Sequence, residues 1–233
     1  MEQLLEFQSV SKSYGKRTAL RDVTLSIGPG RIVGLLGSNG SGKTTLMRIA
    51  SGLTRPDSGT VRASGHEPGP VSKASVSFMP DKPVFESWMT VGDTLDFQRD
   101  FFADYDPGKA SRMLDFMKLS RKDKASSLSK GMQERLQITL ALSRRASLYL
   151  LDEPIGGVDP VSREHILNAL MDFYEEDSTI VVSTHLVADM ERIFDTVVML
   201  KGGGVVLHEE VEQIRIDSGK SIDQLFKEVY AEC

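Results

Sequence analysis

The chain alternates between short runs of apolar residues and longer segments whose apolar residues recur with helical spacing. The short runs predict strands at residues 4–10, 31–37, 75–79, 148–153, 179–184 and 196–200. The periodic segments predict helices directly after residue 43 and at 90–102, 106–119, 131–146, 161–176, 186–194 and 221–231. Buried strands that alternate with helices predict an α/β protein with a largely parallel central sheet.

These elements are distributed unevenly along the chain. From about residue 82 to residue 146 the pattern is almost entirely helical, whereas strands dominate on both sides. We therefore predict an α/β core in two parts, residues 1–81 and 147–233, with an inserted helical subdomain at 82–146. Within these parts, Asp106 before Pro107 predicts a capped helix start, and the glycines of KGGG predict a hairpin after the strand at 196–200.

Composition narrows the possible functions. The 233 residues carry a formal net charge of -5, so the chain has no overall basic field and we expect no nucleic-acid partner. Its one cysteine is Cys233, which excludes a disulfide within the chain. No basic leader with a long apolar run begins the chain, and no apolar stretch approaches the roughly 20 residues that span a bilayer. We therefore expect this chain to associate with a membrane only by binding to another protein that spans the membrane.

The predicted strand at 31–37 runs directly into GSNGSGKTT, and a helical segment follows. This is the phosphate-binding pattern G-x-x-x-x-G-K-[ST], with Gly37, Gly42, Lys43 and Thr44 at its fixed positions. Glycines let backbone N–H groups point at phosphate oxygens, the lysine reaches the β- and γ-phosphates, and the threonine hydroxyl binds Mg²⁺. A glycine turn can match by chance, but the strand before it and the helix after it favour a phosphate loop.

Polar residues that suit catalysis follow two of the apolar runs. Asp152 and Glu153 end LYLLDE, where the first can hold Mg²⁺ through water and the second can polarise a water for in-line attack. Alone, they are better explained as a strand cap, but a phosphate loop in the same chain favours the catalytic interpretation. His185 follows the run at 179–184, and a residue at the carboxyl end of a parallel strand faces the ligand crevice. A lone histidine is otherwise usually structural.

The segment LSKGM, residues 128–132, precedes a helical pattern. Ser129 suits an ordinary helix cap. A helix start also exposes unpaired N–H groups and the positive end of the helix dipole, and these can bind an anion. Taken alone, the segment is better explained as a cap.

In this order the motifs resemble the ATP-binding cassette family, specifically the nucleotide-binding subunit of an ABC transporter. The resemblance extends from residue 4 to the last helical segment. GSNGSGKTT resembles the Walker A motif, LYLLDE the Walker B motif, GGVDP the D-loop, STH the switch-histidine loop and LSKGM the signature LSGGQ. SKSYGKRTAL resembles the place where an aromatic residue stacks on adenine, which implies that role for Tyr14. A tyrosine packed on a sheet edge is the alternative.

The resemblance implies a phosphate-loop NTPase core of the ABC type, with a mostly parallel sheet, an antiparallel β part and an inserted helical subdomain. It also implies ATP and Mg²⁺ as ligands and a head-to-tail pair of subunits, identical or paralogous. Each ATP would lie between one phosphate loop and the signature helix of the other subunit. Ser129 and Gly131 would contact the γ-phosphate across that dimer, and Asp159 would organise the opposite site. ATP binding would stabilise the closed dimer and hydrolysis would release it.

The resemblance assigns a role to each residue of the site. The catalytic residues are Glu153 as base, His185 as γ-phosphate sensor and Lys43. The nucleotide-binding residues are Tyr14, Gly37, Ser38, Asn39, Gly40, Ser41, Gly42, Lys43, Thr44, Thr45, Ser129, Gly131 and Asp159. The Mg²⁺ ligands are Thr44, Asp152 and Asp81.

Three motifs depart from the family pattern. Asp81 in SFMPDKPVF stands where the family has glutamine; it can bind Mg²⁺ or its water but cannot donate a hydrogen bond when ionised. Lys130 replaces a signature glycine, and a phosphate contact and a solvent-exposed side chain explain it equally well. Val158 replaces a D-loop leucine, which is a conservative change.

The resemblance implies an ATPase that powers transport through a separate transmembrane permease subunit, at the cytoplasmic face of the cell membrane. The signature variant and the short C-terminal segment resemble small bacterial exporters of peptides or antibiotics, although an importer subunit stays open. The alternative class is a soluble single-cassette ATPase, such as the iron–sulfur assembly type. Glu153 and His185 weaken a third interpretation, a cassette that binds ATP without hydrolysing it.

Overall fold

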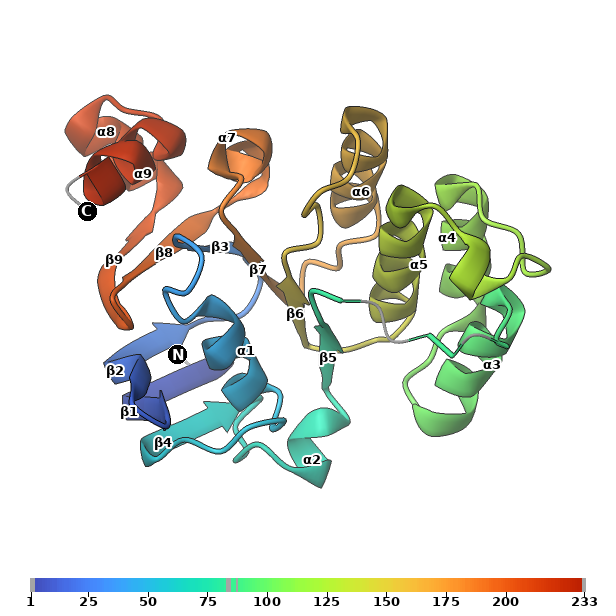
Figure 1. Cartoon of the computed structure of the whole chain (residues 1–233), viewed down its shortest axis with the longest axis horizontal. Helices are drawn as coiled ribbons and strands as arrows, with labels where there is room; N and C mark the ends of the chain where they lie inside the picture. Colours follow the sequence, from blue (N-terminus) through green and yellow to red (C-terminus); the bar gives the residue numbers. More distant parts are fainter. Residues whose placement is uncertain (1–2, 83–84, 87, 232–233) are drawn as a thin grey trace.

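A computed structural model describes residues 3–82, 85–86 and 88–231 of the chain. Cys233, and with it the prediction about disulfides, lies outside the described residues. Figure 1 shows two sheets with α1 (Lys43–Ala50) beside them and a group of helices at the opposite end of the molecule.

The larger sheet has six strands in the order β5-β6-β7-β3-β8-β9. Their bounds are β3 Ile32–Leu36, β5 Val76–Met79, β6 Leu148–Asp152, β7 Thr179–Thr184, β8 Thr196–Lys201 and β9 Gly204–Glu210. All neighbours are parallel except β8 and β9, so the predicted largely parallel sheet is confirmed. Every residue of β3, β6 and β7 is buried, as expected for parallel strands covered on both faces.

The second sheet is antiparallel, with the order β2-β1-β4. It consists of β1 Leu5–Tyr14, β2 Arg17–Ile27 and β4 Ser58–Ala63. The sequence analysis missed β2 and β4, because polar residues interrupt their apolar positions and one face of each is exposed. Phe7 and Leu25 of this sheet share a core with Met47 of α1 and Leu150 of the larger sheet. Through this shared core, the small sheet and α1 pack against the larger sheet.

The described residues between β5 and β6 form helices and no strand, as predicted. They form α3 Val91–Phe101, α4 Pro107–Met117, the 3-10 turn η1 Ala125–Ser127 and α5 Lys130–Leu142, drawn in green and yellow at the right of Figure 1. Asp106 caps α4 by accepting the backbone N–H of Lys109 at 2.9 Å, which confirms the predicted helix start. The boundaries at residues 81 and 146 stay a prediction.

Helix α5 ends earlier than the sequence predicted. The prediction continued it to Ala146, but the helix stops at Leu142. Just beyond that end, the Arg144 guanidinium donates to the carbonyls of Lys73, Ala74 and Val76 at 2.8 to 3.0 Å. These bonds tie the end of α5 to the start of β5, so the backbone leaves the helical path there.

The remaining helices lie around the sheets. They are α2 Pro70–Lys73, α6 Pro160–Asp172, α7 Val187–Met190, the 3-10 turn η2 Glu191–Ile193, α8 Val211–Ser218 and α9 Ile222–Ala231. The sequence analysis missed α2 and α8 and carried α6 four residues too far, because its last apolar positions, Phe173 and Tyr174, pack on the core from beyond the helix end. The predicted hairpin is confirmed, with Lys201 opposite Gly204 and Gly202 and Gly203 at φ +59° and +83°.

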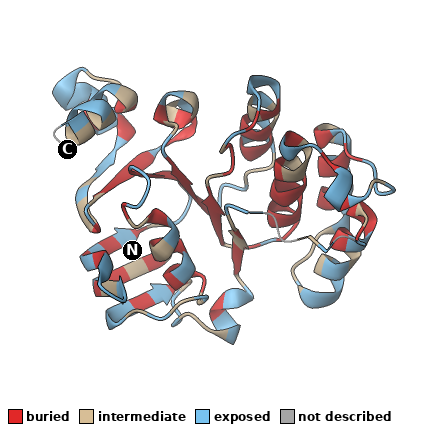
Figure 2. Cartoon of the chain, in the orientation of Figure 1, coloured by how far each residue is buried: buried red, intermediate tan, exposed pale blue. Residues whose placement is uncertain are grey.

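Figure 2 shows buried residues concentrated in the central strands and along α5. One of the buried residues of α5 is a carboxyl, Glu134, which is 2% exposed. The Gln137 amide donates to its Oε2 at 3.2 Å. Burial raises the pKa of Glu134 to about 7, the nearby Lys130 charge lowers it, and the charge of Asp81 raises it.

We predict that this carboxyl makes the fold less stable as the pH rises. Its pKa is higher in the folded chain than in the unfolded chain, so stability falls between about pH 4.5 and pH 7 and stays low above that range. Glu134→Gln removes the titration. In urea unfolding, the variant should exceed the wild type by about 2 kcal/mol more at about pH 8 than at about pH 5. Glu212→Gln, at a side chain 76% exposed, is the control and should show no such pH dependence.

Candidate nucleotide site

The phosphate loop, residues 37–45, joins the end of β3 to the start of α1. Gly42 has φ +113°, and a Cβ atom there would lie 2.6 Å from the carbonyl oxygen of Ala19. Only glycine tolerates this conformation and this close approach. The loop therefore passes close beneath the β1–β2 hairpin before α1 begins. The N–H groups at the N-terminus of α1 are directed at this loop.

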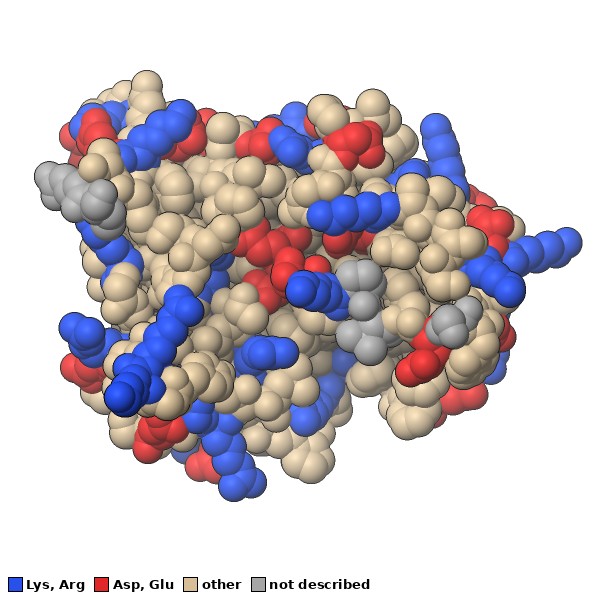
Figure 3. Space-filling model, viewed as in Figure 1, with Lys and Arg blue, Asp and Glu red and all other residues tan. Residues whose placement is uncertain are grey.

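A cavity of about 680 Å³ opens beside this loop. The predicted residues that line it are Tyr14, Asn39, Gly40, Gly42, Lys43, Thr44, Thr45, Asp81, Glu153 and His185. They come from β1, the phosphate loop, the segment after β5 and the ends of β6 and β7. In Figure 3, Asp and Glu side chains gather at the centre of the face shown, with Lys or Arg side chains next to them.

Lys43, Glu153 and His185 form one connected group. The Lys43 ammonium donates to the carbonyl oxygens of Gly37 at 2.8 Å and Ser38 at 3.4 Å, and it lies 3.2 Å from Glu153 Oε1. The other Glu153 oxygen, Oε2, lies 2.9 Å from His185 Nδ1. A carboxylate held between an ammonium and an imidazole suits the proton transfer that the sequence analysis assigned to Glu153.

Asp152 lies buried behind the loop threonine. Its Oδ1 accepts the hydroxyl of Thr44 at 3.2 Å and the hydroxyl of Ser183 at 2.5 Å. Its Oδ2 is buried without a hydrogen-bond partner among the described residues. Burial raises the pKa of Asp152, hydrogen bonds from Ser183 and Thr44 offset part of this rise, and the charges of Asp81 and Glu153 add to it.

The free Oδ2 fits a bound Mg²⁺. Mg²⁺ prefers oxygen ligands and keeps several waters, using one or two carboxylates together with substrate phosphates. Asp152 and Thr44 would hold it, with Asp81 on the same cavity wall. Among the described residues, no His, Cys, Asp and Glu side chains form a cluster of three or more suited to a metal, so phosphate and water would complete the coordination. The ion would supply Lewis-acid stabilisation of phosphate charge.

Tyr14 lies at the mouth of the cavity and is 48% exposed, which leaves its ring accessible to a base. Its strand partner is Arg17, whose guanidinium lies over the phosphate loop, 2.5 Å from where a Gly40 Cβ would be. The sequence analysis missed Arg17. The signal was the spacing in YGKR, since a tight hairpin places the arginine directly opposite the tyrosine.

The remaining loop residues support the cavity from behind. Besides holding Lys43, the Ser38 carbonyl accepts the backbone N–H of Ser41 at 3.1 Å. The Ser41 hydroxyl is buried without a hydrogen-bond partner in the described part of the chain. Gly37 and Ser38 thus orient the lysine through their carbonyl groups.

Ser129, Gly131 and Asp159 are not among the residues that line the cavity of their own chain. Ser129 caps α5 by accepting the Met132 N–H at 3.3 Å, and Asp159 caps α6 by accepting the Ser162 N–H at 3.0 Å. A Cβ on Gly131 would lie 3.1 Å from Asp159 Oδ2, so the two helix starts touch. Hydrogen bonds from the Ser162 backbone and hydroxyl hold the pKa of Asp159 below its usual value, which keeps this carboxyl ionised.

Lys130 does line the cavity of its own chain, although it lies between Ser129 and Gly131. Its ammonium rests against Gly157, at the position a Cβ would occupy. Gly156 and Gly157 also line the cavity, and the sequence analysis missed both. Only the packing of α5 against the start of α6 brings Lys130 and Gly157 together, and spacing along the chain carries no such signal.

None of the helices in the described part of the chain has the length and apolar character that crossing a membrane requires.

Comparison with known proteins identifies the family. The sequence model of the ABC transporter family matches residues 20–156. A Nod factor export ATP-binding protein I of Paraburkholderia xenovorans is 35% identical over 211 residues, which cover 87% of this chain and 69% of that protein. A lantibiotic transport ATP-binding protein, SrtF of Streptococcus pyogenes, is 28% identical over 225 residues, which cover 96% of each chain.

A solved structure of an ATP-binding subunit of an ABC transporter superimposes with a TM-score of 0.86 at 28% identity, over 97% of this chain and 99% of that one. The predicted phosphate-loop α/β fold is therefore confirmed, and the segment matched by the family model includes the phosphate loop, Asp152 and Glu153. The chain belongs to the ABC transporter family and is one of its ATP-binding, ATP-hydrolysing cassettes.

Proposed function

We propose that two such cassettes, identical or closely related, pair head to tail around two ATP molecules. The proposal rests on one observation: each chain carries two half-sites, and of the residues at the start of α5 only Lys130 reaches the cavity of its own chain. One is the cavity with the phosphate loop, Glu153 and His185, and the other is the pair of helix starts with Ser129, Gly131 and Asp159. A second chain in the opposite orientation would place its helix starts over this cavity.

The second half-site has the properties expected of a phosphate contact. Gly131 and the cap Ser129 lie at the start of α5, a helix of 13 residues whose N-terminal dipole end favours negative charge. Beside it, Val161 at the start of α6 is 68% exposed, as suits a residue that a partner covers. These features support the roles proposed for Ser129 and Gly131 at the γ-phosphate of the other chain.

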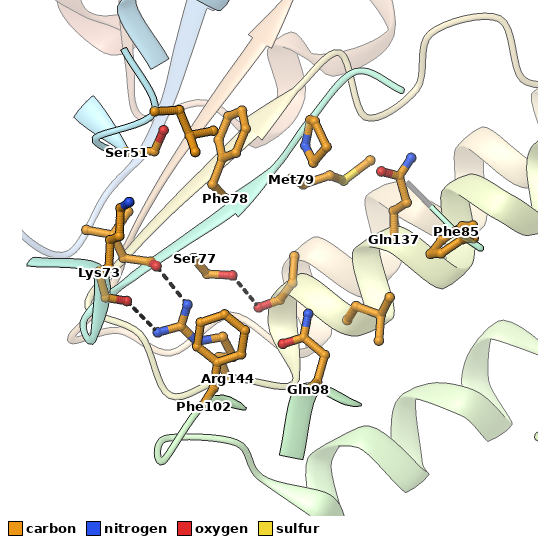
Figure 4. Close-up of a pocket in the computed structure, with 15 residues that line it drawn as sticks. Ser51, Lys73, Ser77, Phe78, Met79, Phe85, Gln98, Phe102, Gln137 and Arg144 are labelled. Carbon is orange, nitrogen blue, oxygen red and sulfur yellow. Dashed lines mark hydrogen bonds between the residues drawn. The ribbon is translucent and has the colours of Figure 1, made fainter. Parts of the chain in front are cut away.

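We further propose that a separate transmembrane subunit docks in a groove between the sheet and the helical segment. The groove encloses about 320 Å³, and Figure 4 shows Phe78 and Met79 on one side with Gln98 and Gln137 on the other. The Oε1 of Gln98 is buried there without a partner among the described residues. Apolar walls with a few unpaired polar groups suit an inserted segment of another protein.

The position of this groove supports a coupling role. Met79 and Pro80 line the groove, and Asp81, the next residue, lines the nucleotide cavity. A segment that moves in the groove would therefore displace the chain that leads to the nucleotide. Leu53 on the rim is 57% exposed and Phe101 at the end of α3 is 69% exposed, which extends the apolar surface available to a partner.

Export is the direction that the relatives favour. The similar proteins named above are a lantibiotic transport protein and a Nod factor export protein, and a linearmycin resistance ATP-binding protein of Bacillus subtilis is 29% identical over 211 residues. We infer export of a peptide or antibiotic from the cytoplasmic face of the membrane, with Mg²⁺ and ATP as the energy source. The alternatives to this proposal are an importer subunit and a soluble single-cassette ATPase.

The first prediction of this proposed function concerns turnover. Glu153→Gln keeps the contact with Lys43 but cannot accept a proton, so we expect ATP binding to persist while kcat falls by about 10²-fold or more. Light scattering in ATP and Mg²⁺ should then show a stable species of twice the 25.7 kDa chain mass. Glu164→Gln, at an exposed position on α6, is the control and should hydrolyse normally. A wild-type turnover rate in Glu153→Gln would contradict the role of Glu153 as the catalytic base.

The second prediction concerns the membrane partner. Leu53→Asp places a charge at the rim of the groove, so the share of the tagged protein that sediments with membranes of its own cell should fall by about fivefold or more. ATP hydrolysis by the isolated chain should be unchanged. Ile216→Asp, at an apolar residue 68% exposed on α8, is the matched control and should leave membrane association intact. Wild-type protein that never sediments with membranes would instead favour the soluble alternative.

A further inference from the structure

Ser183, the first residue of STH, is a fully buried residue of β7 to which neither that motif nor the proposed function gives a role of its own. It lies opposite Asp152 in the register of β6 and β7. Parallel strands in this register place the Ser183 side chain beside the last residue of β6 and next to the turn that begins at Glu153. One hydroxyl therefore reaches the carboxylate of Asp152 and the backbone of Glu153.

The hydroxyl makes one bond as donor and one as acceptor. It donates its proton to Asp152 Oδ1 at 2.5 Å. It accepts the backbone N–H of Glu153 at 3.1 Å, and the Ser183 carbonyl accepts the same N–H, also at 3.1 Å. The hydroxyl thus donates its one proton to Asp152 and accepts a hydrogen bond from Glu153, the two residues to which we assign metal binding and proton transfer.

These bonds have different consequences for the two acids. In Asp152, the Oδ1 atom accepts the hydrogen bond from Ser183. The carboxylate is thereby oriented with its Oδ2 atom unpartnered among the described residues and available to a cation. Glu153 has φ +51°, in the left-handed region that is uncommon for a residue with a side chain. Its N–H bonds to Ser183 hold the backbone in that conformation, which directs the carboxylate toward Lys43 and His185.

We propose that Ser183 is a positioning residue for the metal and for the catalytic base. It orients Asp152 so that one oxygen is free for Mg²⁺, and it holds the turn that aims Glu153. Thr44 also donates to Asp152 Oδ1, but at 3.2 Å, so it does not replace the shorter bond. The inference rests on the roles proposed for Asp152 and Glu153 and is independent of the transport partner.

The test measures metal binding apart from turnover. Binding of Mn²⁺ to the full chain in the presence of ADP is followed by electron paramagnetic resonance, and binding of ADP without metal is measured separately. In Ser183→Ala, Mn²⁺ affinity should fall about tenfold, as is typical when a residue that orients a metal ligand is lost, while metal-free ADP affinity stays within about twofold. Ser183→Thr keeps the hydroxyl and should restore Mn²⁺ affinity to within about threefold.

Two further variants separate the possible explanations. Ser77→Ala removes another buried serine hydroxyl, which donates to the Ala141 carbonyl at 2.9 Å, and should leave Mn²⁺ affinity unchanged. Asp152→Asn should abolish Mn²⁺ binding; if it did not, the metal site itself would be wrong and the inference with it. With that site intact, wild-type Mn²⁺ affinity in Ser183→Ala, or equal losses in Ser77→Ala, would overturn the role of Ser183.

If the alanine variant fails to fold, Ser183→Cys takes its place. A thiol has similar size but donates weakly, so the same drop in Mn²⁺ affinity is expected. Unchanged affinity in the folded cysteine variant would count against the proposal.

Discussion

The register of three parallel strands is the constraint on which the nucleotide site depends. Leu36 of β3 lies opposite Thr184 of β7, and Asp152 of β6 lies opposite Ser183. Because the strands are parallel and in step, the phosphate loop, the two acids and His185 all leave the sheet at one edge. A shift of one residue would turn each of these side chains toward the opposite face. The complete burial of β3, β6 and β7 makes such a shift costly, because every residue in them is part of the core.

The same constraint explains how far sequence alone predicts this protein. Strands buried on both faces appear as unbroken apolar runs, so β3, β6 and β7 were found, and the residues that follow them identified Lys43, Asp152, Glu153 and His185. Strands with one exposed face, β2 and β4, lack that signal. Lys130 and Gly157 are distant in sequence and meet only through helix packing, so their contact was not predictable from spacing. Ser183 was part of the STH motif, but only the register revealed which acids it bonds.

Three charged or titratable side chains of the site contact one another before nucleotide enters. Lys43 is paired with Glu153, and Glu153 with His185, in a cavity where Lys43 is only 5% exposed. A polyphosphate would compete for Lys43 with Glu153, so nucleotide binding would free the carboxylate that we propose as the catalytic base.

The central claim is that each ATP site is shared between two chains, and a cross-link tests it most directly. In Glu153→Gln chains that also carry Cys233→Ser, Asn39→Cys is placed in one chain and Ser129→Cys in another, and a short bis-maleimide is added. The account predicts a product of twice the 25.7 kDa mass only in the mixture, and only with ATP and Mg²⁺. An absence of that product in the mixture, or its formation to the same extent without nucleotide, would contradict a site shared between two copies of this chain.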